Sequence, residues 1–507
     1  MKKAVYSVMI ITMIGKILGF GREILLSFYF GANGISDGYL ISQTIPGTIF
    51  QFVGTGLATS FIPVYIKIKR DNGKTKADLF TNTIISIIMG FSTLVIIVVL
   101  IFARPIVKIF ASGFSGQILD HTVLFTRITI FNLYFSAISY VFSSYLQANE
   151  IFAVTTFVAI PNSVIIMISI FFGAKYNLIA LPVGSILSVF VQMLVLWAAM
   201  KNQDFCFKPN YGFKDHYVNE AAKLMFPVII GISVNQINVL IDRTLASQIL
   251  IGGISALLYA DSLIMFVQGI FSQSIATVYY PSITKYVKEQ DDQLLKEVVK
   301  EALTAVSFIL MPIMIGCMII AQDIIGALYG RGAFNKDAII LTGTALAFYG
   351  VGILGYGIRE ILSRIFYAFL DTKTPMRNAV AGMALNIILN IVLSKIMGIA
   401  GLALATSLSS TITAILLYKD MIKKIHGLFI KVDLKEYCKM GMAAVLMGVI
   451  VYVFRNTMDT GADYAKRTII LIVIGAVTYI NMCGILKVNV YKKMVMLLVG
   501  KVKGKAS

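Results

Sequence analysis

The sequence predicts an all-α, polytopic membrane protein. Three observations lead to this prediction: the composition, the long apolar runs and the placement of the charges. Of 507 residues, 58% are hydrophobic and only 14% are charged, and the mean hydropathy is +0.84, values that soluble domains do not reach. Residues 84–102 and 445–454 are almost continuously apolar, whereas the strands of a membrane barrel alternate apolar and polar residues. The spans are therefore expected to be helices.

About fourteen spans are expected, because each crossing needs about 20 mostly apolar residues and a short connector. Their apolar runs start near residues 5, 37, 78, 117, 153, 178, 217, 255, 299, 338, 376, 399, 438 and 467. The first apolar run follows Lys2 and Lys3 but has no small-residue cleavage site after it, so it is expected to be retained as a helix. Residues 285–300 mix Val and Leu with charged residues, which is typical of an interfacial helix or a solvated connector.

The net charge of +19 is distributed over alternate connectors, which argues against a nucleic-acid-binding surface. Connectors near residues 31–36, 173–177 and 251–255 carry one Lys between them. The basic segments are residues 67–76, 201–214, 285–300, 373–377, 419–439 and 487–505. By the positive-inside rule the basic segments are cytoplasmic, so both termini are expected inside and the number of helices is expected to be even.

The sequence contains no recognisable catalytic machinery. Its cysteines and histidines have no paired or clustered spacing, and it lacks both a Gly-x-Ser-x-Gly motif and a Walker lysine motif. The residues concerned are Cys206, Cys317, Cys438, Cys483, His121, His216 and His426. We therefore expect no enzyme, no disulfide framework and no cofactor.

An internal repeat recurs at a separation of about 219 residues. Gly34-Ile35-Ser36 recurs as Gly253-Ile254-Ser255, and the segment from Ala58 to Pro63 recurs as the segment from Ala276 to Pro281. Six spans separate the copies, so the repeat is parallel and predicts two six-helix lobes related about an axis along the membrane normal. The expected divisions are an N-terminal lobe at 1–215, a C-terminal lobe at 216–425, and helices 13 and 14 with a basic cytoplasmic tail at 426–507.

Charged residues within or beside the apolar spans indicate a transporter. Lys16, Arg22, Glu23 and Asp37 lie in the first sixty residues. An ionisable side chain at the bilayer centre costs roughly 2.5–3.5 kcal/mol, so several together predict a polar interior that compensates them. The planar guanidinium of Arg22 suits a phosphate, with Glu23 or Asp37 orienting it. An internal salt bridge that only neutralises these groups is the alternative.

The second half of the chain adds further cations in apolar runs. If they face the same cavity as Lys16 and Arg22, the cavity suits a pyrophosphate-bearing substrate, whereas a lone cation would need fewer arginines. The candidate substrate-binding residues are Lys16, Arg22, Glu23, Asp37, Arg243, Arg359 and Arg364.

A second cluster suits a small cation. Asn386 and Asn390 share a helix face, Thr406 on the next span adds a hydroxyl, and Asp242 adds a carboxylate. Hard cations such as Na⁺ prefer these oxygen ligands. Interhelical hydrogen bonding by Asn and Thr is the alternative explanation.

The chain resembles the MurJ (MviN) family of lipid II flippases, within the multidrug/oligosaccharidyl-lipid/polysaccharide exporter superfamily, over about residues 5–485. The order and spacing of the motifs carry this resemblance. They are Gly19-Phe20-Gly21-Arg22-Glu23, Phe30-Gly31-Ala32, Asp37, Ile45-Pro46, Ser60-Phe61-Ile62-Pro63-Val64, Gln236-Ile237-Asn238, Ile241-Asp242, Tyr259-Ala260-Asp261, Arg331-Gly332-Ala333-Phe334, Arg364-Ile365-Phe366-Tyr367-Ala368 and Asp371-Thr372-Lys373-Thr374-Pro375.

The resemblance implies alternating access that moves undecaprenyl-diphosphate-linked disaccharide-pentapeptide from the inner to the outer leaflet of a bacterial plasma membrane, for peptidoglycan synthesis and cell shape. It also implies fourteen helices, with two lobes around a cationic central cavity and a groove for the lipid tail formed by the last two helices. Lys16, Arg22 and Asp37 are similar to functional positions of the family, and Glu23 replaces the usual Asp. The Na⁺-site candidates resemble the family's sodium ligands: Asp242, Asn386, Thr406, and Asn390 where an Asp can occur.

Two departures from the family pattern concern cavity cations. Gln51 and Phe52 follow Ile49-Phe50 where the family often has Arg, and Ser262 follows the Tyr-Ala-Asp motif where an Arg is common. Fewer arginines imply weaker diphosphate binding, compensation by Arg243, Arg359 or Arg364, or a different lipid-linked glycan.

Several functions therefore compete. The rivals are a flippase for another undecaprenyl-diphosphate-linked glycan and a cation-coupled drug antiporter of the same superfamily, which would favour acidic and aromatic cavity residues. A membrane-embedded glycosyltransferase would need a carboxylate base and longer external connectors. Expected partners are lipid II, membrane lipids and other cell-wall synthesis proteins, but no nucleic acid. Membrane potential, Na⁺ or H⁺ could supply the energy.

Overall fold

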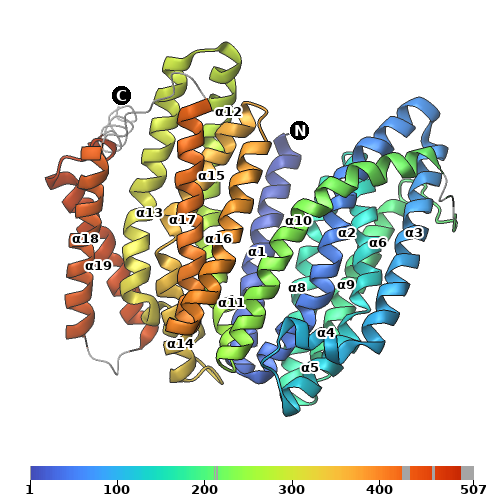
Figure 1. Cartoon of the computed structure of the whole chain (residues 1–507), viewed down its shortest axis with the longest axis horizontal. Coiled ribbons are helices and arrows are strands. Elements are labelled where there is room, and N and C mark those ends of the chain that lie inside the picture. The colour runs from blue at the N-terminus through green and yellow to red at the C-terminus, as the bar shows by residue number, and fades with distance from the viewer. Residues whose placement is uncertain (1, 211, 213–214, 425–433, 459–462, 493–507) are drawn as a thin grey trace. The chain divides into compact units, whose positions relative to one another are not determined.

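The computed structural model describes residues 2–210, 212, 215–424, 434–458 and 463–492. Within these ranges all regular secondary structure is helical. The chain divides into two compact units. The first comprises residues 1–255 with residues 332–334, and the second comprises residues 256–331 with residues 335–507. Figure 1 shows the helices of both units in chain order.

Ten helices belong to the first unit. They are α1 (Lys2–Phe30), α2 (Gly34–Asn72), α3 (Lys74–Ile101), α4 (Ala103–Phe110), α5 (Gly116–Thr129), α6 (Asn132–Ala148), α7 (Phe152–Phe157), α8 (Ala159–Lys175), α9 (Ala180–Lys201) and α10 (His216–Ile249).

The remaining helices build the second unit, except that the first three residues of α11 belong to the first. They are α11 (Gly253–Val267), a π-helical turn (Gln268–Ser272), α12 (Gln273–Glu289), α13 (Asp292–Tyr329), α14 (Lys336–Gly350), α15 (Ile353–Ala368), α16 (Lys373–Met397), α17 (Ile399–Lys424), α18 (Leu434–Thr457) and α19 (Tyr464–Ile485).

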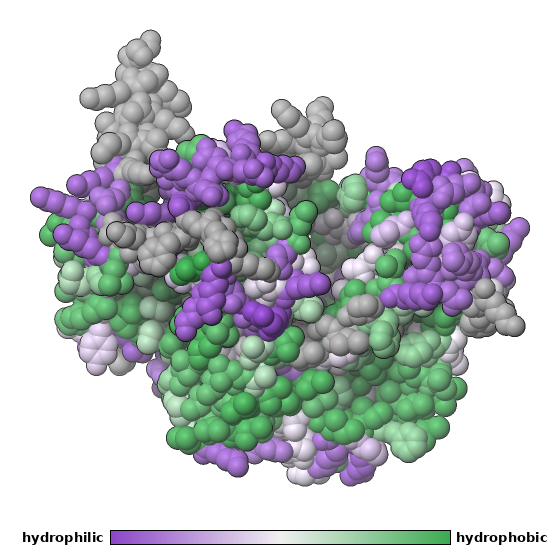
Figure 2. All heavy atoms as spheres, turned by 45° about the horizontal axis from the view of Figure 1, so that its top comes forward, coloured by the Kyte–Doolittle hydropathy of each residue, from purple (hydrophilic) through white to green (hydrophobic). Residues whose placement is uncertain are grey.

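Most of these helices are built to cross a membrane. Among the described residues, 11 helices are long and apolar enough to span a bilayer, or up to 12 if α14 and α15, bent by 44°, form one broken span. The prediction of about fourteen spans is roughly consistent with this number. Hydrophobic side chains cover much of the helix walls, and hydrophilic ones gather toward the helix ends (Figure 2). The prediction of an all-α polytopic membrane protein is confirmed.

The internal repeat extends to the turns of the backbone. After α6, Glu150 adopts a φ of 63°, and the N–H of Ile151 donates to the Leu146 carbonyl over 2.9 Å. After α15, Leu370 adopts a φ of 59°, and the N–H of Asp371 donates to the Phe366 carbonyl, also over 2.9 Å. These matching turns lie about 220 residues apart, as the repeat in the sequence requires.

The predicted lobe boundaries stay a prediction. By its contacts α10 belongs to the first unit, where it packs along α2, although the repeat pairs α10 with α1 as the first helix of a lobe. A unit defined by contacts therefore ends near Ser255, whereas the repeat places the division before His216.

Small and aromatic residues hold the first unit together. Tyr65 stacks on Phe61 with ring centroids 5.6 Å apart and meets Tyr145 edge-on at 5.1 Å, and all three side chains are fully buried. Gly184 of α9 lies so close to Ser169 of α8 that a Cβ at this glycine would overlap the serine side chain. Such contacts suit membrane helices, whose association depends on close packing because lipid tails are as apolar as the side chains.

In the second unit, α18 and α19 pack against α13 (Figure 1), and a buried charge cluster joins the three helices. The Asp323 carboxylate on α13 is 2% exposed and lies 2.6 Å from Nε of Arg455 on α18 and 3.1 Å from Nε of Arg467 on α19. Thr468 donates its hydroxyl to the Asp323 carbonyl over 2.8 Å. This cluster fixes the extra C-terminal helix pair that the sequence placed outside the repeat.

Candidate functional site

Three of the candidate substrate ligands lie on one uninterrupted helix, α1. Lys16 is exposed, whereas Arg22 and Glu23 are half-buried, just before the buried Leu26 and Ser27. A half-buried guanidinium retains its charge and presents planar donors that match phosphate oxygens. The part of α1 that carries Arg22 and Glu23 can therefore bind an anion while its neighbours pack against protein.

Asp37 has a defined structural task in the first unit. Its side chain is fully buried, and its Oδ2 accepts a hydrogen bond from the N–H of Gly252 over 2.7 Å. Its Oδ1 accepts from the Ser255 N–H over 2.7 Å and from the Ser255 hydroxyl over 2.6 Å. A carboxylate at a helix N-terminus satisfies free N–H groups and interacts favourably with the helix dipole. Asp37 thus caps the start of α11, and its role as a substrate ligand stays a prediction.

The two copies of the Gly-Ile-Ser motif therefore meet in the structure. The Ser36 hydroxyl lies 3.3 Å from the Ser255 hydroxyl, and both side chains are buried. Gly252, with a φ of 88°, lies so close to the Ala32 carbonyl that a Cβ would overlap it. The turn before α2 and the turn before α11 are thus packed together, at the helix ends that the charge pattern predicts to be external.

Asp242 and Arg243 lie half-buried on α10. The Arg243 guanidinium donates to the Ile254 carbonyl over 3.2 Å, so it also holds the start of α11. Asn238, one turn earlier, donates to Asp242 Oδ2 over 3.5 Å. Arg243 is therefore engaged by protein in this structure, and its predicted role in substrate binding stays a prediction.

Gln51, at a position where a cation was considered, is paired with another neutral side chain. Gln236 on α10 donates through Nε2 to Gln51 Oε1 over 3.0 Å. The Gln51 side chain is exposed, whereas Gln236 is 6% exposed. Ser262 in the second unit is half-buried. Neither residue supplies a positive charge.

The two candidate arginines of the second unit both lie on α15. Arg364 forms an ion pair with Glu360, 3.1 Å from Nη2 to Oε1, and its guanidinium lies 5.6 Å from the ring centre of Tyr280. Arg359 lies 5.5 Å from the ring centre of Tyr356. Because Arg364 and Glu360 are each 34% exposed, water partly screens their pair. An incoming diphosphate could therefore compete for Arg364.

The Na⁺-site candidates of the second unit lie together on α16 and α17. Asn390 donates to Asn386 Oδ1 over 2.9 Å, and Asn386 donates to the Thr406 hydroxyl over 3.4 Å. Asn386 is 3% exposed and Asn390 is fully buried. These oxygens fit a hard cation chemically, and their hydrogen bonds also fit the interhelical alternative. The fourth candidate, Asp242, belongs to the first unit.

No group of three or more His, Cys, Asp or Glu side chains that could hold a metal ion is found in the part of the chain that the structure describes. The buried cluster of Asp323, Arg455 and Arg467 was not predicted from the sequence. The signal was present, since all three charges lie beside apolar runs. Their partnership was not visible because more than a hundred residues separate Asp323 from the arginines.

Comparison with known proteins identifies the family. The family model described as lipid II flippase MurJ matches residues 26–473. The chain belongs to the lipid II flippase MurJ family. A probable lipid II flippase MurJ from Buchnera aphidicola subsp. Baizongia pistaciae is 28% identical over 463 residues, covering 90% of each chain. The protein of the same description from Haemophilus influenzae is 27% identical, covering 92% of this chain and 96% of its own.

Solved structures show the same fold. A lipid II flippase MurJ in an inward closed conformation matches with a TM-score of 0.82 and 24% identity, covering 96% of this chain and 99% of its own. An inward-facing multidrug resistance transporter of the MATE family, in the MOP superfamily, matches with a TM-score of 0.67 and 12% identity, covering 83% and 98%. These similarities confirm the predicted all-α membrane fold, and the division into two six-helix lobes stays a prediction.

Membership of the MurJ family also decides the class of protein. The members of a flippase family are transporters and not enzymes, which agrees with the prediction that this protein is not an enzyme. Many apolar helices together with this family indicate a multi-pass protein of the bacterial inner membrane. The resemblance drawn from the motifs is therefore confirmed at the level of family and fold.

Proposed function

We propose that this protein is a flippase that moves lipid II from the inner to the outer leaflet of the bacterial plasma membrane by alternating access. The observation that carries the proposal is the MurJ family match across residues 26–473. The charged residues on membrane-spanning helices support it, because they give a head group something to bind within the bilayer. The protein needs only to bind the head group, close behind it and reopen on the other side.

Diphosphate binding begins with Lys16 and Arg22 on α1, and Glu23 orients Arg22. Arg22 supplies a planar, bidentate donor, whereas Lys16 supplies a mobile point charge. Arg359 and Arg364 on α15 add charge, and Arg364 exchanges Glu360 for phosphate oxygens. Arg243 and Asp37 act at the start of α11, which they already hold.

Asp37 is proposed to hold the start of α11 within the first unit. Three short hydrogen bonds join Asp37 to Gly252 and Ser255. Together they hold the turn before α11 against the first turn of α2.

Na⁺ is the proposed coupling ion, with Asp242, Asn386, Asn390 and Thr406 as ligands. The amide and hydroxyl groups on α16 and α17 are already within hydrogen-bond reach of one another. Membrane potential adds to the driving force, since moving one charge across it is worth roughly 2.3 kcal/mol per 100 mV. No other cofactor is proposed.

Both termini are proposed to be cytoplasmic, as the basic connectors require under the positive-inside rule. Membrane lipids and other cell-wall synthesis proteins are the proposed partners besides lipid II. A flippase for another undecaprenyl-diphosphate-linked glycan is the second candidate, and the neutral Gln51 and Ser262 favour it. A cation-coupled drug antiporter shares the fold of the MATE match but would need fewer arginines.

Depletion of the protein in its native cell tests the proposal. Lipid II should accumulate in the inner leaflet as the protein disappears, because its synthesis continues while its export stops. Leaflet-resolved labelling of lipid II measures this. In a strain without a redundant flippase, an unchanged amount of lipid II in the inner leaflet would contradict the proposed function. Accumulation of a different lipid-linked glycan would support the second candidate.

A further inference from the structure

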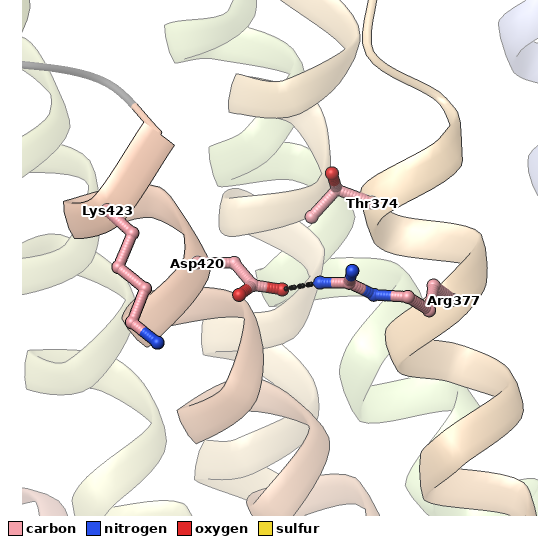
Figure 3. Close-up of a pocket in the computed structure, with 4 residues that line it drawn as sticks. All are labelled: Thr374, Arg377, Asp420 and Lys423. Carbon is pink, nitrogen blue, oxygen red and sulfur yellow. Dashed lines mark hydrogen bonds and ion pairs between the residues drawn. The ribbon is translucent and has the colours of Figure 1, made fainter.

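A polar pocket lies between the ends of α16 and α17 that the charge pattern predicts to be cytoplasmic. Its volume is about 230 Å³, and Thr374, Arg377, Asp420 and Lys423 line it. Figure 3 shows Arg377 reaching across from α16 to Asp420, with Lys423 farther along α17. On the α16 side, the pocket is lined from the segment Asp371 to Pro375. This motif has no role in the proposed transport mechanism.

The motif builds one wall of this pocket. Asp371 accepts hydrogen bonds from the Thr374 N–H over 3.0 Å and from the Thr374 hydroxyl over 2.7 Å. Both contacts fix the first turn of α16, and Pro375 in that turn has no N–H to satisfy. The positive end of the helix dipole therefore lies at the pocket, adjacent to Arg377.

Cations exceed acids around the pocket. Arg377 and Lys423 are exposed, as are their neighbours Lys373 and Lys419. Asp420 is the acidic lining residue, and its Oδ2 accepts from both Arg377 Nη2 and Asn378 Nδ2 over 2.8 Å. The Arg377 side chain is 72% exposed, so water screens this pair and a stronger anion can replace Asp420 as the partner of Arg377.

Exposed apolar side chains border the same helix turn. Leu370, held at a φ of 59° between α15 and α16, is 91% exposed, and Met376 in the first turn of α16 is 58% exposed. An apolar side chain this exposed beside a basic pocket suits the boundary between hydrocarbon and head groups. The ligand is therefore expected to carry both a phosphate and an acyl chain.

We propose that this pocket binds the phosphate of an anionic phospholipid from the cytoplasmic leaflet. Arg377 donates its planar fork to the phosphate, Lys423 adds a point charge, and Leu370 and Met376 contact the acyl chains. Basic pockets at the cytoplasmic ends of membrane helices bind anionic head groups through these interactions. The site is independent of lipid II transport, so it stands even if the proposed function fails.

Native mass spectrometry of the purified full chain with phosphatidylglycerol tests the site. The double variant Arg377→Ala/Lys423→Ala should weaken lipid binding about tenfold to thirtyfold, from two lost cations. Asp420→Asn should tighten it several-fold, because it removes the carboxylate that competes for Arg377. The matched control Lys285→Ala/Lys288→Ala removes the same charge from exposed positions at the end of α12 and should leave binding within about twofold of the original.

Three outcomes overturn the proposal. If the control variant loses as much affinity for phosphatidylglycerol as the double variant, lipid binding depends on the net charge of the protein and not on this pocket. If Asp420→Asn weakens lipid binding as much as the double variant does, the ion pair between Arg377 and Asp420 is only structural. If inorganic phosphate displaces phosphatidylglycerol at equal concentration, the pocket binds free phosphate and not the lipid. Thermal unfolding of each variant confirms that the comparison is made between folded proteins.

Discussion

At the scale of single residues, the charges on the membrane helices have different tasks. Asp37 is fully buried and bonded to the start of α11, whereas Arg22 is half-buried and Lys16 is exposed. Burial with satisfied oxygens indicates a structural role, and partial exposure of a cation leaves it available to a ligand. The sequence alone predicts all three as substrate ligands.

Arg22→Ala should abolish complementation of a strain depleted of the protein, while leaving the variant folded and in the membrane. Loss of a hydrogen bond from a charged group costs about 1.5–3 kcal/mol, which corresponds to roughly a tenfold to 150-fold loss of affinity. Growth under depletion measures the effect, and Arg127→Ala, on the exposed face of α5, is the matched control. Full complementation by the Arg22 variant would remove it as the diphosphate ligand.

Asp37→Ala should destabilise the protein, because it leaves the buried N–H groups of Gly252 and Ser255 without an acceptor. Each such group costs about 1–3 kcal/mol. Thermal unfolding in detergent measures the change. Asn33→Ala removes the exposed N-cap of α2 and should cost only about 1 kcal/mol. If both variants unfold at the same temperature, the capping of α11 by Asp37 contributes little.

At the scale of helices, pairs separated in the chain are joined by a few buried polar contacts. The C-terminal pair α18 and α19 is held on α13 through Asp323, and α16 is held on α17 through Asn386 and Thr406. Membrane helices gain little from the hydrophobic effect in their association. Such contacts therefore decide which faces meet.

Asp323→Ala should loosen the C-terminal helix pair by about 3–5 kcal/mol, since it leaves Arg455 and Arg467 largely buried without a counter-charge. The unfolding temperature should fall, and protease should cut between α13 and α18 sooner than in the original protein. Asp120→Ala breaks an ion pair whose two side chains are both 64% exposed, so it should change little. If Asp323→Ala and Asp120→Ala lower the unfolding temperature equally, the buried cluster does not hold α18 and α19 on α13.

Asn390→Asp should strengthen Na⁺ binding, because a carboxylate is a better ligand for a hard cation than an amide. A Na⁺-dependent rise in the unfolding temperature, with choline as the reference cation, measures the effect. Asp242→Ala should remove the Na⁺ response, and Asn386→Ala should weaken it. Persistence of a full response in the Asp242 variant would leave only interhelical hydrogen bonding for Asn386 and Asn390.

At the scale of the whole molecule, the charge pattern predicts the orientation in the membrane. The two exposed cysteines, Cys206 and Cys438, both lie in basic segments that are expected to be cytoplasmic. The connector at Asn33 carries no charge and is expected outside.

A membrane-impermeant thiol reagent added to intact spheroplasts should therefore leave the original protein unlabelled and should label the variant Asn33→Cys. After permeabilisation, Cys206 and Cys438 should react in both proteins. Gel-shift detection of the labelled protein measures the result. Labelling of the original protein in intact spheroplasts would reverse the proposed orientation.

Local patterns along the chain are enough to predict the class, the helices, the repeat and the family. Apolar runs predict spans because a bilayer requires about 20 apolar residues for each crossing, and every predicted start lies in or within two residues of a helix. The repeat persists in the turns after α6 and α15, since backbone geometry follows local residue order. Family motifs are likewise local in the chain.

The partners of the charges become known only from the folded chain. Asp37 meets Gly252 and Ser255, and Asp323 meets Arg455 and Arg467, across more than a hundred residues of chain in each case. The type of a residue shows that its charge needs a partner when it is buried. It does not show which of many distant groups is that partner. Packing of the helices makes that choice, and it gives Asp37, a predicted ligand, the cap of a helix as well.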